Sequence, residues 1–297
     1  MTQLDFGRLG VWGHLDTLAA PDVIAYARRA EELGYGTLWV PEAVGREPIA
    51  LCSLLAAATD RINLGTSIIN IWGRDAQAAR MAALTLAEAS GGRFALGLGV
   101  SHPHLAEKLR GHRFERPLSR MREYLAAYRA AVYRGPVPPG GSEPPVMVAA
   151  LRERMVDLSA TDADGALPYL VTAERVAWMR DRLDAAADSR RPRLVVTLPA
   201  VIGEPGDRDA ARAYLKPYLR TPTYQASWEL QGFEAADWDP PGSDRLVDAM
   251  AAIGPVAFVR ERLGAMHAAG ADHVAIIPLA PDGTTEHAPT LEQLAGA

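Results

Sequence analysis

The chain has 297 residues, of which 48% are hydrophobic and 23% charged, an ordinary globular balance with ample material for a core. Its net charge is -5 and its arginines are scattered among acidic residues, so we expect no nucleic acid and no anionic membrane as a partner. Cys52 is the single cysteine, which excludes a disulfide framework and fits a reducing cytoplasm.

The chain begins without a recognisable targeting segment. In the first ten residues, MTQLDFGRLG, no basic stretch precedes an apolar one, so we expect no signal peptide. No apolar run approaches the roughly 20 residues that span a bilayer. We therefore expect a cytoplasmic protein.

Short β-type runs then alternate with helical patterns along nearly the whole chain. In the first unit, Pro21 suits the first turn of a helix and Gly34 its C-terminal cap. The expected strands cover 7–13, 37–42, 62–72, 93–100, 145–150, 165–171, 193–202 and 273–279. The expected helices cover 21–34, 48–60, 75–90, 118–135, 152–163, 173–188, 207–219 and 255–270.

The order of these elements predicts an α/β fold. Several strands are apolar without alternation, as expected of a parallel sheet covered on both faces. About eight β/α units favour a (β/α)8 TIM barrel over an open sheet, and we expect 1–297 to form one barrel domain. Segment 221–243 breaks the alternation and is rich in aromatic residues, proline and acid. We interpret it as an insertion over the C-terminal mouth, a lid, or else as a surface excursion with its own small core.

The barrel hypothesis selects candidate site residues, because active sites of such barrels lie at the C-terminal ends of the strands. There the chain places side chains that exchange protons near neutral pH and aromatic rings that could wall a planar ligand. The catalytic candidates are His102, Glu42 and His14. The substrate-pocket candidates are Trp12, Trp72 and Tyr169.

Two further features of the strand ends point to a ligand. Gly97 and Gly99 would let a flat molecule lie close to the backbone. Arg152 and Arg154 stand where a helix N-terminus meets the mouth, which suits an anion. Each candidate has a structural alternative: a helix cap for His102, an ion pair with Arg46 for Glu42, barrel core for Trp12, and solvent-facing positions for the two arginines.

Other chemical signatures are missing. The segment GLGVSH lacks the third glycine of a dinucleotide fingerprint, and there is no Walker A motif, no G-x-S-x-G and no H-E-x-x-H. The histidines lack metal-ligand spacing, so we expect no metal site.

Two stretches in sequence, GTSIINIW and GGRFALGLGVSH, resemble the luciferase-like monooxygenase superfamily, particularly its branch that uses the deazaflavin coenzyme F420. The early AEELGYGTLWVPE and the late HAAGADHVAIIPL are similar to the same superfamily. The resemblance covers nearly the whole chain. It implies a bacterial-luciferase-like barrel with one flavin-like cofactor in its mouth, and a non-proline cis peptide or β-bulge at Ser67–Ile68.

The resemblance also implies which residues meet the cofactor. Ser67 and Ile68 would back its ring, Gly99, Val100 and Ser101 would contact the ring, and His102 would face its reactive side. The phosphate tail would lie near 149–155. The cofactor-binding candidates are thus Ser67, Ile68, Gly99, Val100, Ser101, Ala150, Arg152 and Arg154.

Three departures separate this chain from the sugar-phosphate dehydrogenases of that branch. Glu42-Ala43 stands where they carry Asp-His, His102 replaces a glutamate, and Leu151-Arg152 replaces a glycine pair. Their substrate is therefore not carried over. We expect an oxidoreductase that transfers a hydride between coenzyme F420 and a small organic substrate. The alternatives are an FMN-dependent monooxygenase and a barrel that binds ligands without redox chemistry. A homodimer is left open.

Overall fold

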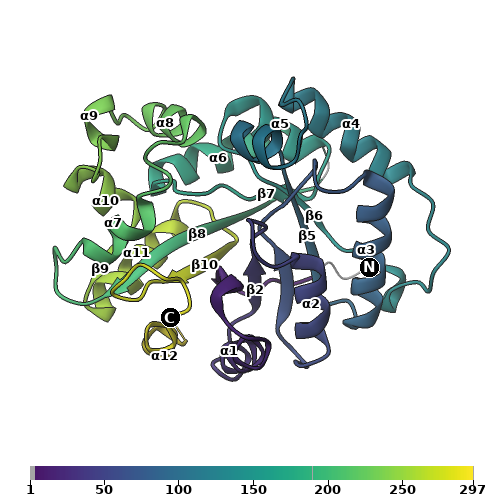
Figure 1. The fold of residues 1–297 in the computed structure, drawn as a ribbon, viewed down its shortest axis with the longest axis horizontal. Helices are drawn as coiled ribbons and strands as arrows, with labels where there is room; N and C mark the ends of the chain where they lie inside the picture. Colours follow the sequence, from purple (N-terminus) through teal and green to yellow (C-terminus); the bar gives the residue numbers. More distant parts are fainter. Residues whose placement is uncertain (1–3, 189, 297) are drawn as a thin grey trace.

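Eight parallel strands close into a barrel in the computed structural model, which describes residues 4–188 and 190–296 (Figure 1). The ends of the expected range 1–297, including the first three residues of the N-terminal stretch, lie outside the described residues. The barrel closes because β10 pairs with both β1 and β8. The barrel strands, in spatial order, are β1 (Leu9–Trp12), β2 (Thr37–Val40), β3 (Asn63–Thr66), β5 (Phe94–Gly99), β6 (Val146–Val148), β7 (Gly165–Ala166), β8 (Arg193–Ile202) and β10 (His273–Pro278). The predicted TIM barrel is confirmed.

Two short strands extend this frame. Strand β4 (Ile69–Asn70) continues the path of β3 and pairs with β5, while β9 (Ala252–Gly254) pairs with β8. Of the expected strand 165–171, the first two residues form β7. The remaining residues, 167–171, form a loop at the barrel mouth.

Helices follow most strands and cover the outside of the barrel. Helix α1 begins one residue before Pro21, and Gly34 has φ +83° just after it, so both predicted boundary signals are confirmed. The helices are α1 (Ala20–Glu32), α2 (Pro48–Ala56), α3 (Ala76–Ala89), α4 (Pro117–Ala130), α5 (Glu153–Thr161), α6 (Ala173–Ala186), α7 (Asp209–Leu215), α8 (Pro222–Glu229), α9 (Ala235–Trp238), α10 (Asp244–Met250), α11 (Val256–Ala268) and α12 (Ala288–Leu294). A π-helical turn, Leu105–Leu109, precedes α4.

The connection between β8 and β10 differs from the expectation. The sequence pattern predicts one helix over 207–219 followed by an insertion over 221–243. In the structure the excursion from the β/α alternation runs from α7 through β9, and α11, the helix that follows the excursion, packs against both β8 and β10. Figure 1 shows α7–α10 gathered on the left, on the other side of the barrel from α3. The terminal helix α12 had no counterpart among the expected elements.

The barrel interior is filled by large side chains that need small neighbours. Trp39 on β2 is fully buried, and a Cβ at Gly65 on β3 would lie 2.4 Å from its ring. Its indole nitrogen donates to Nε2 of the buried His273, whose Nδ1 lies 2.8 Å from the Gly7 carbonyl oxygen. This interior packing places the strand ends, and therefore the site, at fixed positions.

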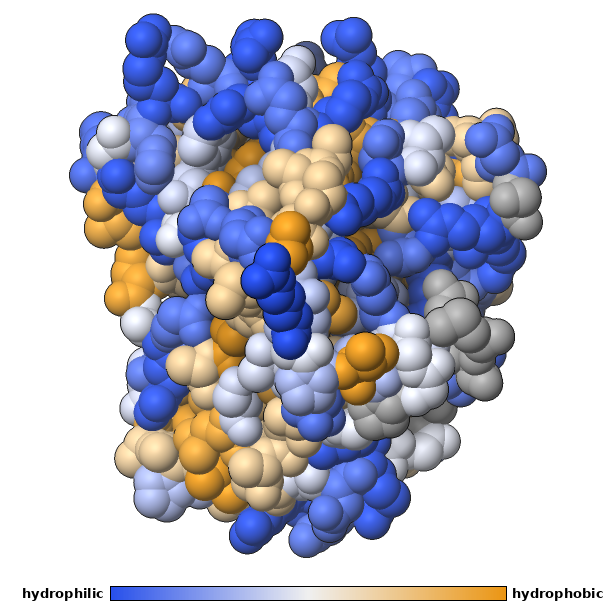
Figure 2. Space-filling model, turned by 90° about the vertical axis from the view of Figure 1, so that its right-hand side faces the viewer, coloured by the Kyte–Doolittle hydropathy of each residue, from blue (hydrophilic) through white to orange (hydrophobic). Residues whose placement is uncertain are grey.

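The outer surface mixes hydrophilic and hydrophobic side chains. Figure 2 shows a largely hydrophilic face broken by smaller hydrophobic areas. Exposed large hydrophobic residues include Met81, Val132 and Val137. A membrane-crossing helix, which must be long and apolar, is not found within residues 4–188 and 190–296. A homodimer stays a prediction.

Candidate active site

A cavity of about 300 Å³ opens at the C-terminal ends of the barrel strands, where barrel enzymes carry their active sites. Its volume is at the lower end of the roughly 300–1,000 Å³ typical of small-molecule sites. A larger hollow, about 940 Å³, is lined by residues that precede strands, such as Pro145 and Asp164. It therefore lies at the opposite end of the barrel, and we place the candidate site in the smaller cavity.

Most of the predicted site residues line this cavity. They come from the ends of six strands that are far apart in sequence and that the barrel brings together. They are Trp12, His14, Glu42, Ser67, Ile68, Val100, Ser101, His102, Arg152 and Tyr169. The predicted residues Gly99, Ala150, Arg154 and Trp72 are not among its lining residues in the described part of the chain. The roles of all these residues in binding and catalysis stay predictions.

The peptide between Ser67 and Ile68 is cis, as the resemblance implies. Strand β3 ends just before this peptide and β4 begins just after it. The Ser67 carbonyl oxygen accepts a hydrogen bond from the Trp12 indole at 3.2 Å, and the Ile68 carbonyl oxygen accepts from the Glu42 backbone N–H at 3.1 Å. The segment is thus fixed from two neighbouring strands.

The two glycines of β5 lie close to other parts of the chain. A Cβ at Gly97 would lie 1.9 Å from the Thr66 carbonyl oxygen, and a Cβ at Gly99 would lie 2.5 Å from the Ile68 side chain. The glycines therefore make room for the chain's own β3–β4 segment, and Ile68, which Gly99 accommodates, lines the cavity. That they also let a flat molecule lie close to the backbone stays a prediction.

His102 lies half-buried in the cavity wall. Its Nδ1 is 3.4 Å from the Thr223 hydroxyl, and its ring packs 5.4 Å from Tyr224 and 5.9 Å from His104. Burial, with a smaller effect of His104, lowers the pKa of His102 to about 4. The ring is therefore neutral at pH 7. The expectation that His102 exchanges protons near neutral pH is corrected, because its pKa lies well below that range.

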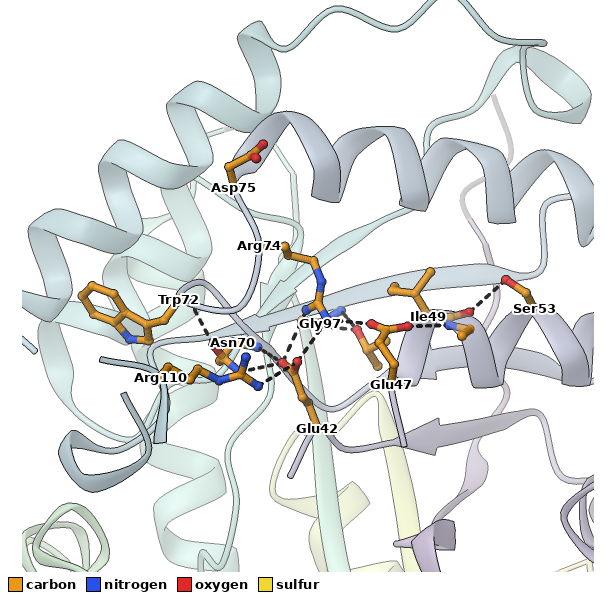
Figure 3. Close-up of polar contacts among 12 residues, drawn as sticks. Glu42, Glu47, Ile49, Ser53, Asn70, Trp72, Arg74, Asp75, Gly97 and Arg110 are labelled. Carbon is orange, nitrogen blue, oxygen red and sulfur yellow. Dashed lines mark hydrogen bonds and ion pairs between the residues drawn. The ribbon is translucent and has the colours of Figure 1, made fainter. Parts of the chain in front are cut away.

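Glu42 lies at the centre of a polar network (Figure 3). Its carboxylate accepts from the Asn70 backbone N–H at 2.6 Å, from Arg74 at 3.0 Å and from Arg110 at 3.2 Å. Arg74 also donates to Glu47 at 2.6 Å. The Glu42 side chain is 7% exposed and engaged on both oxygens, so it braces this network, and its catalytic role stays a prediction. Its partners are Arg74 and Arg110 in place of the expected Arg46.

Aromatic rings form a second side of the cavity. The Trp12 ring lies 5.6 Å from Tyr169 and 6.5 Å from His14. His14 sits near the opening, with its ring nitrogen 3.6 Å from the Asp16 carboxylate. Trp72 instead points away, packing against Phe114 while its indole donates to the Val100 carbonyl oxygen at 2.8 Å. It supports the wall from outside.

Arg152 and Arg154 are separated by the start of α5. Arg152 is the residue just before this helix and is exposed at the cavity rim, whereas Arg154 is exposed in the first turn. In the described residues neither guanidinium has an acidic partner within ion-pair distance. Ala150 is buried behind the rim. Arg152 is therefore the better placed of the two for an anionic group.

Three cavity residues come from the excursion after β8 and were not predicted. Tyr218 follows α7, while Thr223 and Tyr224 lie in α8. Thr223 and Tyr224 belong to segment 221–243, whose aromatic content was the signal for an insertion over the mouth, and that the segment acts as a lid stays a prediction. Sequence periodicity gave no means of selecting these particular residues.

Comparison with known proteins agrees with this geometry. The family model for luciferase-like monooxygenases matches residues 3–273. A Mycobacterium tuberculosis protein, provisionally named a coenzyme F420-dependent oxidoreductase, is 30% identical, with 89% of this chain and 91% of that protein covered.

Solved structures share the fold. The F420-dependent tetrahydromethanopterin reductase of Methanopyrus kandleri matches with a TM-score of 0.73 at 16% identity, covering 99% of this chain and 98% of that one. An F420-dependent secondary alcohol dehydrogenase matches with a TM-score of 0.77 at 11% identity, and a Pseudomonas putida Baeyer-Villiger monooxygenase in complex with FMN with 0.73 at 15%. Each covers 97% of this chain, and 97% and 96% of those chains respectively. The chain belongs to the luciferase-like monooxygenase family.

Proposed function

We propose that this protein is an oxidoreductase that transfers a hydride between coenzyme F420 and a small organic substrate. The observation that carries the proposal is the cavity at the barrel mouth, walled by aromatic rings and one neutral imidazole. The relative that is 30% identical over 89% of this chain supports F420 as the cofactor.

The cavity residues fit a deazaflavin. Ile68, Val100 and Leu151 offer apolar contacts for a flat ring, and Ser101 offers a hydroxyl at its edge. The anionic tail of the cofactor would lie toward Arg152, near the first turn of α5, where backbone N–H groups and the helix dipole favour negative charge. When bound, the deazaflavin supplies a carbon centre that exchanges a hydride with the substrate.

The protein's own residues then handle the proton. His102 is neutral at pH 7, so a free ring nitrogen can accept a hydrogen bond from a substrate hydroxyl, while the lowered pKa makes the ring a weak base. Proton transfer by a positioned side chain contributes about 10²–10⁴-fold to a rate. Its contact with Thr223 Oγ1 orients the ring, and Trp12 and Tyr224 exclude water from the same space.

A turnover assay tests the proposal. The purified protein is mixed with oxidised F420 and a panel of small secondary alcohols, and separately with reduced FMN, the same compounds and oxygen. We expect reduction of F420 by at least one alcohol, seen as loss of its visible absorbance, without oxygen consumption. Oxygen-dependent product formation with FMN, and no change with F420, would instead identify an FMN-dependent monooxygenase.

A further inference from the structure

Three tyrosine hydroxyls meet at one wall of the cavity. Tyr169 follows β7, Tyr214 lies in α7, and Tyr218 follows α7. The Tyr169 hydroxyl contacts that of Tyr214 and lies 3.1 Å from that of Tyr218. Tyr169 and Tyr218 line the cavity, whereas Tyr214 is buried behind them. We call these residues the tyrosine trio.

The hydroxyls of the trio are close enough to exchange hydrogen bonds with one another. Each phenol has one O–H to donate. The Tyr214 hydroxyl is buried and has the hydroxyls of Tyr169 and Tyr218 as partners, so its O–H stays within the trio. Tyr169 and Tyr218 line the cavity, so either one can direct its O–H to a ligand oxygen there.

These protons are present under ordinary conditions. Burial raises the pKa of Tyr218 to about 12 and raises that of Tyr214 well above its usual value. The trio therefore offers a hydrogen-bond donor across the neutral pH range.

The wall around the trio is held in place by its neighbours. Leu170, next to Tyr169, has φ +55°, and its carbonyl oxygen accepts from the Trp228 indole at 3.3 Å. Trp228 is fully buried in α8, and its ring lies 6.0 Å from that of Tyr224. The excursion is thus anchored to the β7 loop, so the hydroxyls are preorganised.

The side chains next to the trio are uncharged. Trp12, Leu167 and Pro168 line the cavity beside Tyr169, and His102 across from Tyr224 is neutral. Glu42 also lines the cavity, but its carboxylate is compensated by guanidinium groups. Arg152, which lines the same cavity from the start of α5, is assigned above to the anionic tail of the cofactor. An ionised group of a second ligand beside the trio would be desolvated without a partner of its own, which is unfavourable.

We propose that the tyrosine trio recognises the substrate's oxygen, and that the substrate is an uncharged organic molecule with a carbonyl or hydroxyl group at its reacting end. This inference rests on the proposed function and deepens it, since it assigns the substrate class to the same cavity. The trio acts as a specificity determinant, because an analogue without the oxygen cannot accept a hydrogen bond from Tyr169 or Tyr218.

Binding of a matched pair of probes tests this inference. Cyclohexanone and methylenecyclohexane have nearly the same shape, but the hydrocarbon lacks the oxygen acceptor. Their dissociation constants are measured by ligand-observed NMR, on the protein with F420 and also without it. We expect the ketone to bind at least about 5-fold more tightly, which is the fold-change that the net contribution of one hydrogen bond, about 1 kcal/mol, corresponds to.

The two cavity-facing hydroxyls of the trio predict an unusual pattern in the variants. Tyr218→Phe leaves the Tyr169 O–H at the cavity wall, and Tyr169→Phe leaves that of Tyr218, so each single variant keeps most of the ketone preference. The double variant removes both hydroxyls of the trio that line the cavity, and the preference should fall below about 2-fold. Tyr133→Phe, on the loop after α4, is the control and should leave the ratio unchanged.

The outcomes separate this inference from the proposed function. Equal affinity of the wild-type protein for both probes overturns the inference, whether or not F420 binds. It is also overturned if the double variant keeps the ketone preference but loses F420 affinity, because the hydroxyls would then hold the cofactor. If F420 fails to bind while the probe ratio follows the pattern above, the proposed function fails and the recognition of oxygen stands.

Discussion

Replacing Glu42 with glutamine should destabilise the fold and weaken cofactor binding together. Glu42 joins two guanidinium groups, and its side chain is 7% exposed, against 15% for Arg74 and 26% for Arg110. Removing one partner of a buried ion pair costs about 3–5 kcal/mol. Arg74 keeps Glu47 and Arg110 is partly hydrated, so we expect a loss of about 2 kcal/mol in the free energy of unfolding.

The same substitution should also change the cavity wall around Ile68. Glu42 holds Asn70 through its carboxylate and Ile68 through its backbone N–H, on the segment that carries the cis peptide. We therefore expect F420 to bind several-fold more weakly to Glu42→Gln. Fluorescence titration with F420 gives this affinity, and equilibrium unfolding in urea gives the stability.

Glu261→Gln is the matched control, since Glu261 is exposed on α11 and has no ion-pair partner in the described chain. It should change stability by less than about 0.5 kcal/mol. A double-mutant cycle of Glu42→Gln with Arg110→Gln should give a coupling of about 1–2 kcal/mol. The reasoning is refuted if Glu42→Gln is as harmless as the control, or if the two substitutions are additive.

Three further predictions concern charge and protonation. His102→Ala should lower turnover about 10²–10⁴-fold and change F420 affinity less than about 10-fold. Turnover of the wild-type protein should show no inflection near pH 6.5. Near-normal turnover of the variant would remove His102 from the chemistry. His273 is fully buried with its pKa lowered to about 4, so the unfolded chain binds more protons between about pH 6.5 and 4, and stability falls as the pH falls through that window. From pH 7.5 to 5 this residue should account for about 2 kcal/mol, which His273→Gln should abolish in urea unfolding; an unchanged pH dependence would contradict it. Arg152→Glu should weaken F420 binding, more so at low salt, while Arg154→Glu should have little effect; equal effects would show that both arginines reach the tail.

The barrel could be predicted because its signals are local. Apolar runs of strand length, helical patterns and markers such as Pro21 and Gly34 report on neighbouring residues, and the rule about strand ends then collects distant side chains without further information. The excursion after β8 escaped this reasoning because the helix at 207–219 looks locally like any barrel helix. That this helix does not cover the barrel between β8 and β10 depends on α11, which packs against both strands instead.

The errors at the site have a common physical origin. Gly97 and Gly99 signal a close approach, but the sequence does not say whether a ligand or the chain's own Thr66 and Ile68 approaches. The low pKa of His102 depends on burial by α8, which no local pattern reveals. Glu42 and its partner Arg110 are 68 positions apart, so their pairing follows from the fold alone.

Equilibrium binding of oxidised F420 and of FMN, with a variant that fills the cavity, tests the central claim most directly. Val100→Trp places a large ring at the cavity wall, while Val132→Trp changes an exposed position, 61% accessible, as the control. We predict that the wild-type protein and Val132→Trp bind F420 more tightly than FMN, and that Val100→Trp loses at least about 100-fold in F420 affinity while circular dichroism remains unchanged. Tighter binding of FMN, or F420 binding that Val100→Trp leaves intact, would contradict the assignment of a deazaflavin to this cavity.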